Sequence, residues 1–377
     1  MTADVNVVGA GPAGLMCADI LSAAGLRVRV IDHKRQPARK FLLAGRGGLN
    51  LTHSEPLEKF LTRYGSTQSF LEPIIRAFPP NELVNWCQRL GVETFVGSSG
   101  RVFPKVMKAS PLLRALLQRL ASRGVILEPQ TPWLEFDATP TIFAMGGASW
   151  PELGSDASWA GAFRAAGIEI MEFMPSNCRV LIPWTEHFSS RFQGQPLKNI
   201  TLRYGPMQSK GELMISRDGL EGGAIYQLSP AFREHPGLDL HIDLKPSLNA
   251  DAIAKRLAQP RLKMSETNFL RKAAGLTPAA INLLREAGQK IDAQHIKDVQ
   301  LKPRGLAGLE RAISSAGGVA LSELDEHCQL RKMPRHYCVG EMLDWEAPTG
   351  GYLLQACFST AVIAARHLAQ TLVKSRP

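Results

Sequence analysis

The feature that most constrains this chain is a glycine motif between a strand-like and a helix-like segment. The apolar run Val5–Val8 leads into GAGPAG at residues 9–14, and the residues up to Ala24 carry apolar side chains at helical spacing. A second apolar run then ends at Asp32, 18 positions after Gly14. Glycines at this spacing, with an acid about 20 residues further on, predict a βαβ unit that binds a dinucleotide.

Each glycine of the motif has its own expected role. Gly9 permits the tight turn after the strand, and Gly11 lets a pyrophosphate approach the backbone. Gly14 lets the helix pack closely on the strand. The helix N-terminus offers unpaired N–H groups and a partial positive charge to the phosphates, and Asp32 can accept hydrogen bonds from ribose hydroxyls.

This motif does not separate FAD from NAD, but three further segments do so by resemblance. They are KFLLAGRGGLNLT at 40–52, AMGGASWP at 144–151, and GEMLD at 340–344 continued by TGGYLLQ at 349–355. Together they resemble a bacterial family of NAD(P)/FAD-dependent flavoproteins that includes the bile-acid enone reductase and the ribosomal RNA dihydrouridine synthase. Shorter matches lie at 211–213, 219–220, 227–229 and 317–319, so the resemblance spans nearly the whole chain.

The resemblance implies an α/β fold with a Rossmann-like FAD-binding domain of the two-dinucleotide-binding-domain flavoprotein type. Residue patterning agrees, because short alternating runs typical of antiparallel sheet follow residue 175 and helical periodicity follows residue 250. The expected domains are an FAD-binding domain at 1–172 and 335–377, an inserted β-rich domain at 173–248 and 316–334, and a small helical domain at 249–315.

The resemblance also implies which residues hold a noncovalent FAD. Arg46 is expected at the pyrophosphate or flavin edge, unless it forms a surface salt bridge, and Asn50 at the flavin ring or ribityl chain. Glu341 is expected on the ribityl chain, and the helix that opens at 350–352 faces the flavin N1–C2=O edge. The expected cofactor-binding residues are Gly9, Gly11, Pro12, Ala13, Gly14, Asp32, His33, Lys40, Arg46, Gly47, Gly48, Asn50, Leu51, Thr52, Ala144, Gly146, Gly147, Gly340, Glu341, Gly350, Gly351, Tyr352 and Leu353.

The substrate side is less constrained by sequence. Arg101 and Phe103 lie in SGRVFPK at 99–105, which either lines the substrate or is a plain turn before a helix. Tyr352 is either a proton donor or a packing residue. Much of the family carries a cysteine at the position of Leu49 and an asparagine at that of Leu353, so roles of those side chains do not transfer. No catalytic residue is assigned.

Cysteine and histidine spacing argue against a disulfide framework or a metal site. None of the six cysteines forms a CxxC pair, and the nine histidines show no HExxH spacing. No apolar run approaches the roughly 18 residues of a membrane span. The chain passes from Met1 almost directly into a strand-like run, so no signal peptide is expected and a cytoplasmic location is predicted.

Positive charge is concentrated in one helix-rich stretch. The formal net charge is +10, and residues 250–315 alone hold 12 basic and 6 acidic side chains. Such an excess fits a polyanionic partner, of which structured RNA is the expected one. A solvated basic helical surface is the alternative.

Two classes of function follow. In the first, the protein is an oxidoreductase that reduces an activated C=C bond by hydride transfer from flavin N5, in a uridine of ribosomal RNA or in a small conjugated ketone. No second GxGxxG motif is present, so NAD(P)H is expected to bind transiently or a partner to supply electrons. In the second, the protein is a flavin-binding RNA or ribosome partner without turnover. The oligomeric state is left open.

Overall fold

The computed structural model describes residues 3–374, which divide into two compact units. Unit 1 consists of residues 3–174 and 314–374, and unit 2 of residues 175–313. Unit 1 is therefore assembled from both ends of the chain, with unit 2 inserted between them.

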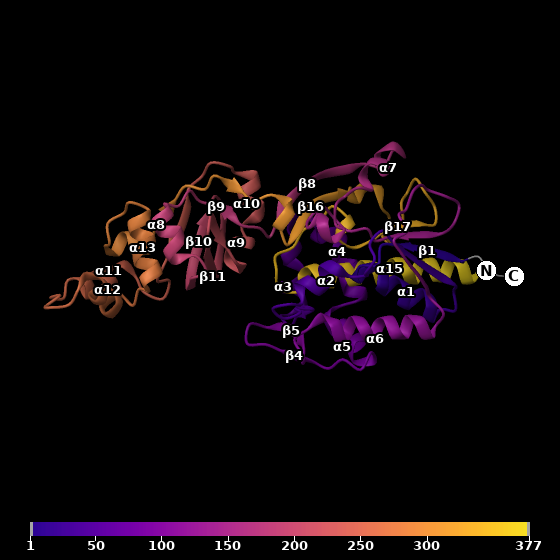
Figure 1. The fold of residues 1–377 in the computed structure, drawn as a ribbon, viewed down its shortest axis with the longest axis horizontal. Helices are drawn as coiled ribbons and strands as arrows, with labels where there is room; N and C mark the ends of the chain where they lie inside the picture. Colours follow the sequence, from indigo (N-terminus) through magenta and orange to yellow (C-terminus); the bar gives the residue numbers. More distant parts are fainter. Residues whose placement is uncertain (1–2, 375–377) are drawn as a thin grey trace. The chain divides into compact units, whose positions relative to one another are not determined.

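Unit 1 is built on a five-stranded parallel sheet with the order β17-β7-β1-β2-β6 (Figure 1). Val7 of the central strand lies opposite Val30 on one side and Ile142 on the other. A strand covered on both faces favours the continuous apolar run seen in the sequence. The strands are β1 (Val5–Val8), β2 (Val28–Asp32), β6 (Ile126–Pro129), β7 (Thr141–Phe143) and β17 (His336–Cys338).

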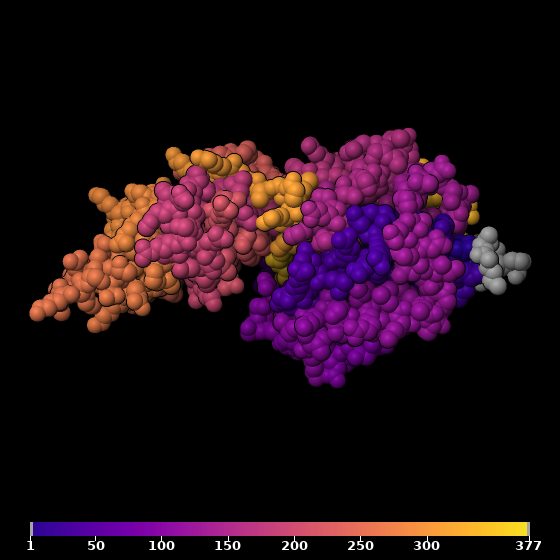
Figure 2. Space-filling model, in the orientation of Figure 1, coloured from indigo at the N-terminus to yellow at the C-terminus, as the bar shows by residue number. Residues whose placement is uncertain are grey.

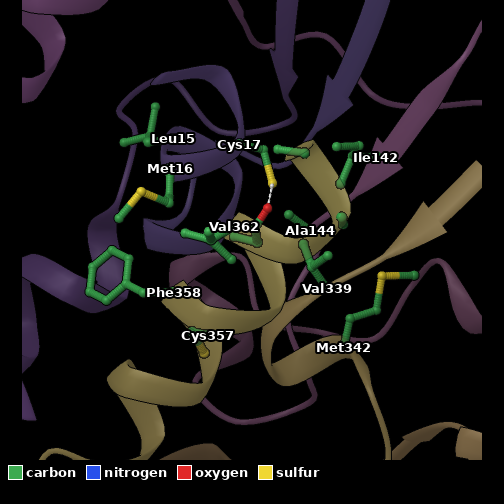
Figure 3. Close-up of a cluster of buried hydrophobic side chains, with 14 of the residues drawn as sticks. Leu15, Met16, Cys17, Ile142, Ala144, Val339, Met342, Cys357, Phe358 and Val362 are labelled. Atoms are coloured by element: carbon green, nitrogen blue, oxygen red, sulfur yellow. Dashed lines mark hydrogen bonds between the residues drawn. The ribbon is translucent and has the colours of Figure 1, made fainter. Parts of the chain in front are cut away.

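Two helices from opposite ends of the chain pack together in unit 1. Helix α1 (Pro12–Ala23) contacts both α15 (Tyr352–Lys374) and α6 (Ala109–Ser122). Figure 3 shows the apolar cluster that joins them, in which Cys17 Sγ donates to the Ala361 carbonyl at 3.5 Å. The other elements are α2 (Arg39–Ala44), α3 (Leu57–Leu61), α4 (Gln68–Ala77), α5 (Pro80–Arg89), α7 (Ala160–Ala165) and the small antiparallel sheet of β3 (Thr52–His53), β5 (Arg101–Pro104) and β4 (Thr94–Val96).

Unit 2 has a seven-stranded antiparallel sheet whose helices share its hydrophobic core. Side chains at the helix starts fix several of these helices: Asn249 accepts from Ala252 N at 2.8 Å, and Asp292 accepts from His295 N at 2.9 Å. In sheet order the strands are β14 (Val299–Leu301), β13 (Leu240–Asp243), β10 (Pro196–Tyr204), β11 (Met207–Ser216), β12 (Gly219–Glu221), β9 (Val180–Leu181) and β15 (Gly305–Leu306). The helices are α8 (Glu186–Phe192), α9 (Gly223–Tyr226), α10 (Ser229–Glu234), α11 (Ala250–Leu257), α12 (Glu266–Ala274), α13 (Pro278–Glu286) and α14 (Ala293–Lys297).

The observed boundaries differ from the predicted domains in two places. Residues 316–334 belong to unit 1, because β16 (Ser314–Val319) pairs with β8 (Ile170–Ser176) and Val319 bridges to Leu343. The stretch 249–315 does not form a separate helical domain, since its helices pack on the antiparallel sheet in one core. Burial across elements, which local patterning does not record, decides both points.

Two local expectations are also corrected. Residues 34–50 are basic and glycine-rich, which predicts an ordered loop, but they contain α2, because Phe41 is buried and anchors one helical face. The Ser110-Pro111 pair predicts an N-cap followed by the first helical residue, but α6 begins at Ala109, with Lys108 as its N-cap. Pro111 is tolerated inside the first turn because N–H groups there have no intrahelical acceptor.

Some features are absent from the described part of the chain. No helix within residues 3–374 is both long and apolar enough to cross a membrane. No three potential ligands among His, Cys, Asp and Glu gather in that range as a metal site would require. All six cysteines are buried free thiols.

Candidate functional site

The glycine motif lies at the carboxyl end of β1, where its residues face different surroundings. A Cβ on Gly9, whose φ is +102°, would lie 2.7 Å from the carbonyl carbon of Ala144, and one on Gly14 would overlap the Gly9 carbonyl oxygen. A Cβ on Gly11 would meet no atom within 4 Å. Gly9 and Gly14 are thus required by packing, whereas Gly11 leaves open space at the N-terminus of α1.

Asp32 holds the glycine motif in place. Its Oδ2 accepts from Ala10 N at 2.7 Å, and its Oδ1 accepts from Lys34 N at 2.7 Å. His33 is exposed, with ring nitrogens 4.0 Å from Asp32 Oδ1 and 3.9 Å from Asp156 Oδ2. The carboxylate that the sequence assigns to a ribose therefore lies beside the glycine turn.

Lys40 and Glu341 form an ion pair across 301 residues of sequence. Lys40 Nζ lies 2.7 and 2.9 Å from the two Glu341 carboxylate oxygens and donates to Ser149 Oγ at 2.5 Å. Glu341 Oε1 also accepts from Ser315 N at 3.2 Å. A Cβ on Gly147 would overlap Ser315 Oγ, so this glycine is required by the same cluster.

Ser149 and Ser315 are not among the residues that sequence analysis selected. Ser149 lies inside a matching segment, but nothing about its position pointed to Lys40. Ser315 precedes the Gly317-Gly318 match, and its Oγ accepts from Ala148 N at 3.0 Å. Only the folded chain brings these two serines to Glu341, Ser149 through its hydroxyl and Ser315 through its backbone N–H.

The third matching segment meets the glycine motif through Gly340. A Cβ on Gly340, whose φ is +77°, would lie 3.0 Å from the Cβ of Ala13 at the start of α1. Gly340 N donates to Thr360 Oγ1 at 3.0 Å, and its carbonyl accepts from Trp345 Nε1 at 2.8 Å. Close packing at α1 therefore explains this glycine.

The same segment meets the loop at 46–52 through Gly351. A Cβ on Gly351, whose φ is +96°, would lie 2.5 Å from the carbonyl carbon of Thr52. Two side-chain oxygens on this loop, Asn50 Oδ1 and Thr52 Oγ1, are buried and have no hydrogen-bond partner in the described chain. Buried polar atoms are normally paired, so these two mark a place where a ligand with N–H or O–H donors fits.

Tyr352 is held in a polar and aromatic network. Its hydroxyl donates to Glu55 at 2.5 Å, and its ring stacks on His53 with centroids 5.5 Å apart. Arg63 donates to both Glu55 carboxylate oxygens, at 3.0 and 2.8 Å. Burial raises the pKa of Tyr352, and the hydrogen bond to Glu55 raises that pKa further, against the opposing charge of Arg63. The hydroxyl is committed to Glu55, which favours the packing role over that of a proton donor.

Glu55, His53 and Arg63 were missed by sequence analysis. Burial by itself acts to raise the pKa of Glu55, but hydrogen bonds from Arg63 and Tyr352 outweigh it and lower that pKa to about 2. Burial lowers the pKa of His53, whose Nε2 lies 3.0 Å from the Ser99 carbonyl oxygen. No local motif marks these residues, because the network is completed by Tyr352, which lies far away in the sequence.

The remaining predicted residues lie on or beside the same loop. Arg46 is exposed and takes part in no ion pair among residues 3–374. Arg101 pairs in register with His53, and Phe103 stacks on Phe95 at 5.8 Å. Strand β5 thus lies next to the loop that carries Asn50.

The other predicted cofactor-binding residues differ in exposure and backbone conformation. Gly47 is exposed and Leu353 is half-buried, while Gly48 and Gly350 have φ values of +121° and +136°. Leu51 N donates to Val102 O at 2.9 Å, and Gly146 O accepts from Trp159 Nε1 at 3.0 Å.

The matching segments therefore converge around the N-terminus of α1, the loop at 46–52 and the start of α15. A family model described as the HI0933-like protein Rossmann domain matches residues 3–367. The chain belongs to this family. Leu49, where much of the family has cysteine, is fully buried in the core of unit 1.

Curated relatives match along nearly the whole chain. The ribosomal RNA dihydrouridine synthase of Escherichia coli (strain K12) is 23% identical over 97% of this chain and 98% of its own length. The 3-dehydro-bile acid delta(4,6)-reductase of Clostridium scindens is 23% identical over 97% of this chain and 99% of its own. The similarity to these relatives therefore spans nearly the whole chain.

Solved structures share the fold. The 3-ketosteroid delta1-dehydrogenase of Sterolibacterium denitrificans superposes with a TM-score of 0.52 at 12% identity, covering 98% of this chain and 99% of that one. Sdh1 of Mycobacterium smegmatis gives a TM-score of 0.51 at 16% identity, covering 100% of this chain and 70% of that one. The predicted fold class, a Rossmann-type FAD-binding domain with an inserted antiparallel sheet, is confirmed. The chain is a flavoprotein oxidoreductase.

Proposed function

We propose that this protein is an FAD-dependent reductase that saturates an activated C=C bond, and that its substrate is a uridine in structured RNA. The observation that carries the proposal is that Asn50 Oδ1 and Thr52 Oγ1 are buried without a hydrogen-bond partner in the described chain, on the loop that Gly351 contacts. A flavin ring carries an N–H donor and its ribityl chain carries hydroxyl donors, so both oxygens fit this cofactor.

The rest of the cradle suits the other parts of FAD. Open space at Gly11 lets a pyrophosphate approach the N-terminus of α1, which has no side-chain cap. In this proposal Asp32 and Glu341 would accept hydrogen bonds from ribose and ribityl hydroxyls, and the exposed guanidinium of Arg46 would bind a phosphate. When bound and reduced, FAD supplies a hydride at N5.

One observation favours a reductase over a flavin-binding partner without turnover. Relatives named for dihydrouridine synthesis and for delta(4,6) reduction both act, by their names, on C=C bonds. The chain contains no second GxGxxG motif, so we propose NAD(P)H as a reductant that binds transiently at the FAD domain. With the Tyr352 hydroxyl committed to Glu55, solvent supplies the proton.

A basic surface on unit 2 supports RNA as the substrate. It consists of α11, α12 and the loop between them, which Figures 1 and 2 show at one end of unit 2, and we call it the basic hairpin. Leu262 at its tip is 81% exposed. Its basic side chains are all exposed and form no ion pair within the described residues: Lys255, Arg256, Arg261, Lys263, Arg271 and Lys272.

Unpaired cations of this kind bind phosphates with a characteristic dependence on salt. Each phosphate contact contributes a slope of about −0.7 to −0.9 to log affinity against log salt. Reversing Arg261, Lys263, Arg271 and Lys272 to Glu should weaken RNA binding and flatten that slope, without change in FAD content. The matched control reverses four exposed basic residues elsewhere on unit 2, namely Arg191, Lys198, Lys210 and Arg217.

Turnover is tested with the purified protein, which we expect to be yellow with FAD released by denaturation. FAD-loaded protein is reduced anaerobically with NADH or NADPH and then mixed with RNA or with a small conjugated ketone. Reoxidation of the flavin with formation of dihydrouridine supports the proposal. If only the ketone reoxidises the flavin, the protein is a small-molecule reductase. If neither RNA nor the ketone reoxidises it, the result favours a flavin-binding RNA or ribosome partner without turnover. A protein that stays colourless after incubation with FAD contradicts the whole assignment.

A further inference from the structure

A cavity of about 290 Å³ lies among the helices of unit 1, away from the glycine motif. Asp19 and the C-terminal half of α1 form one wall, and α5, α6 and α15 contribute Arg89, Arg119, Arg123 and Arg366. At 1.5 Å of rise per residue, the residues of α1 that line the cavity, from Met16 to Ala23, lie roughly 6 to 16 Å from the helix N-terminus. The cavity is therefore separate from the proposed FAD cradle.

The charges around this cavity do not balance. Four guanidinium groups face one carboxylate, that of Asp19. Helices α1, α4, α5 and α6 also end here, and each helix C-terminus is equivalent to roughly −0.5 charge. With all four helix ends and Asp19 counted, about one positive charge is left without compensation.

Some of the arginine N–H groups around the cavity also lack hydrogen-bond acceptors. Asp19 already accepts from Trp86 Nε1 at 2.8 Å and from Arg123 Nη1 at 2.8 Å. Arg119 Nε lies 3.2 Å from Asp19 Oδ1, yet Nε and Nη2 of Arg119 are buried and make no hydrogen bond in the described chain. Buried donors without an acceptor are costly, so an oxyanion in the cavity would be stabilised.

Electrostatic coupling among the arginines supports this picture. Burial lowers the pKa of Arg119, and the charges of Arg123 and Arg89 lower it further, while Asp19 opposes them. Arg89 and Arg366 are exposed and form no ion pair among residues 3–374. These two guanidiniums are therefore free to bind a ligand that enters the cavity.

We propose that this cavity binds a small molecule through a phosphate group. The planar fork of a guanidinium matches two phosphate oxygens, and a phosphate brings the negative charge that the arginines lack. Met16, Ile20 and Phe78 provide an apolar wall for the remainder of the ligand. The volume is at the lower end of the range for small-molecule pockets, which suits a small phosphorylated compound.

The test measures binding of inorganic phosphate and pyrophosphate to the FAD-loaded protein by calorimetry at constant ionic strength. Saturating FAD keeps the probes out of the glycine-motif cradle. The variant is Arg89→Gln with Arg366→Gln, which leaves the buried Asp19 network intact. The control is Arg114→Gln with Arg331→Gln, two exposed arginines of unit 1 outside the cavity with the same loss of charge.

We expect one pyrophosphate per chain and an affinity at least roughly tenfold weaker in the cavity variant, from the loss of charge-assisted hydrogen bonds. The control variant should bind like wild type. Absence of binding to wild type at millimolar probe, or equal weakening in both variants, would overturn the proposal. An RNA hairpin that displaces pyrophosphate from both the wild type and the control would assign the cavity to RNA phosphates and overturn the small-molecule ligand.

Discussion

Gly11→Val is the substitution that most directly tests the cofactor cradle. A Cβ at this position meets no protein atom within 4 Å, and Gly11 has a φ of −77° that valine tolerates. The free energy of unfolding without FAD should therefore change by no more than about 1 kcal/mol. FAD binding should fail, because the added methyl groups fill the space where the pyrophosphate meets α1.

The magnitude follows from the contacts that are lost. A hydrogen bond to a charged group contributes about 1.5–3 kcal/mol, so loss of a single bond between α1 and a phosphate lowers FAD affinity roughly 10- to 150-fold. Exclusion of the pyrophosphate removes more than one such hydrogen bond, so the variant should purify without flavin.

The assay combines FAD titration by fluorescence quenching with thermal unfolding of the flavin-free protein. The matched control is Gly161→Val on α7, which lies outside the matching segments and where a Cβ likewise meets no atom within 4 Å. Wild-type FAD content in Gly11→Val would refute the placement of the pyrophosphate. A large loss of apo-protein stability would refute the inference that the space at Gly11 is open.

Three further outcomes are expected. Asp32→Ala should weaken FAD binding less than Gly11→Val in the same titration, because it removes hydrogen bonds without adding a clash. Gly351→Ala should lower the free energy of unfolding by roughly 2–5 kcal/mol in urea, since its φ of +96° and its contact with Thr52 both oppose a Cβ. Glu55→Gln should lower the melting temperature at pH 7. Because the folded-state pKa of Glu55, about 2, lies below its ordinary value of 4.5, its stabilisation is complete above pH 4.5 and is lost as pH falls toward 2. A difference in melting temperature between wild type and Glu55→Gln that is as large at pH 2 as at pH 7 would contradict this explanation.

Local patterns were sufficient for the parts of the fold that depend on local geometry. The turn after β1 needs a glycine with positive φ at Gly9, and close packing of the helix on the strand needs Gly14. These glycines therefore predict the βαβ unit. The resemblance added the other segments of the FAD domain. Sequence did not reveal α2 or the true start of α6, since buried Phe41 and the tolerance of Pro111 in a first turn depend on context.

The sequence by itself determined the strand–turn–helix that begins the chain, the excess of positive charge at 250–315 and, by resemblance, the family. These are properties of short segments or of composition. Only the tertiary structure brought Lys40 to Glu341, Thr52 to Gly351 and Glu55 to Tyr352, because each pair joins segments roughly 300 residues apart. The arginine cavity also depends on the tertiary structure, because its walls come from helices that no local sequence pattern relates. The positive charge of its arginines becomes uncompensated only where these helices meet.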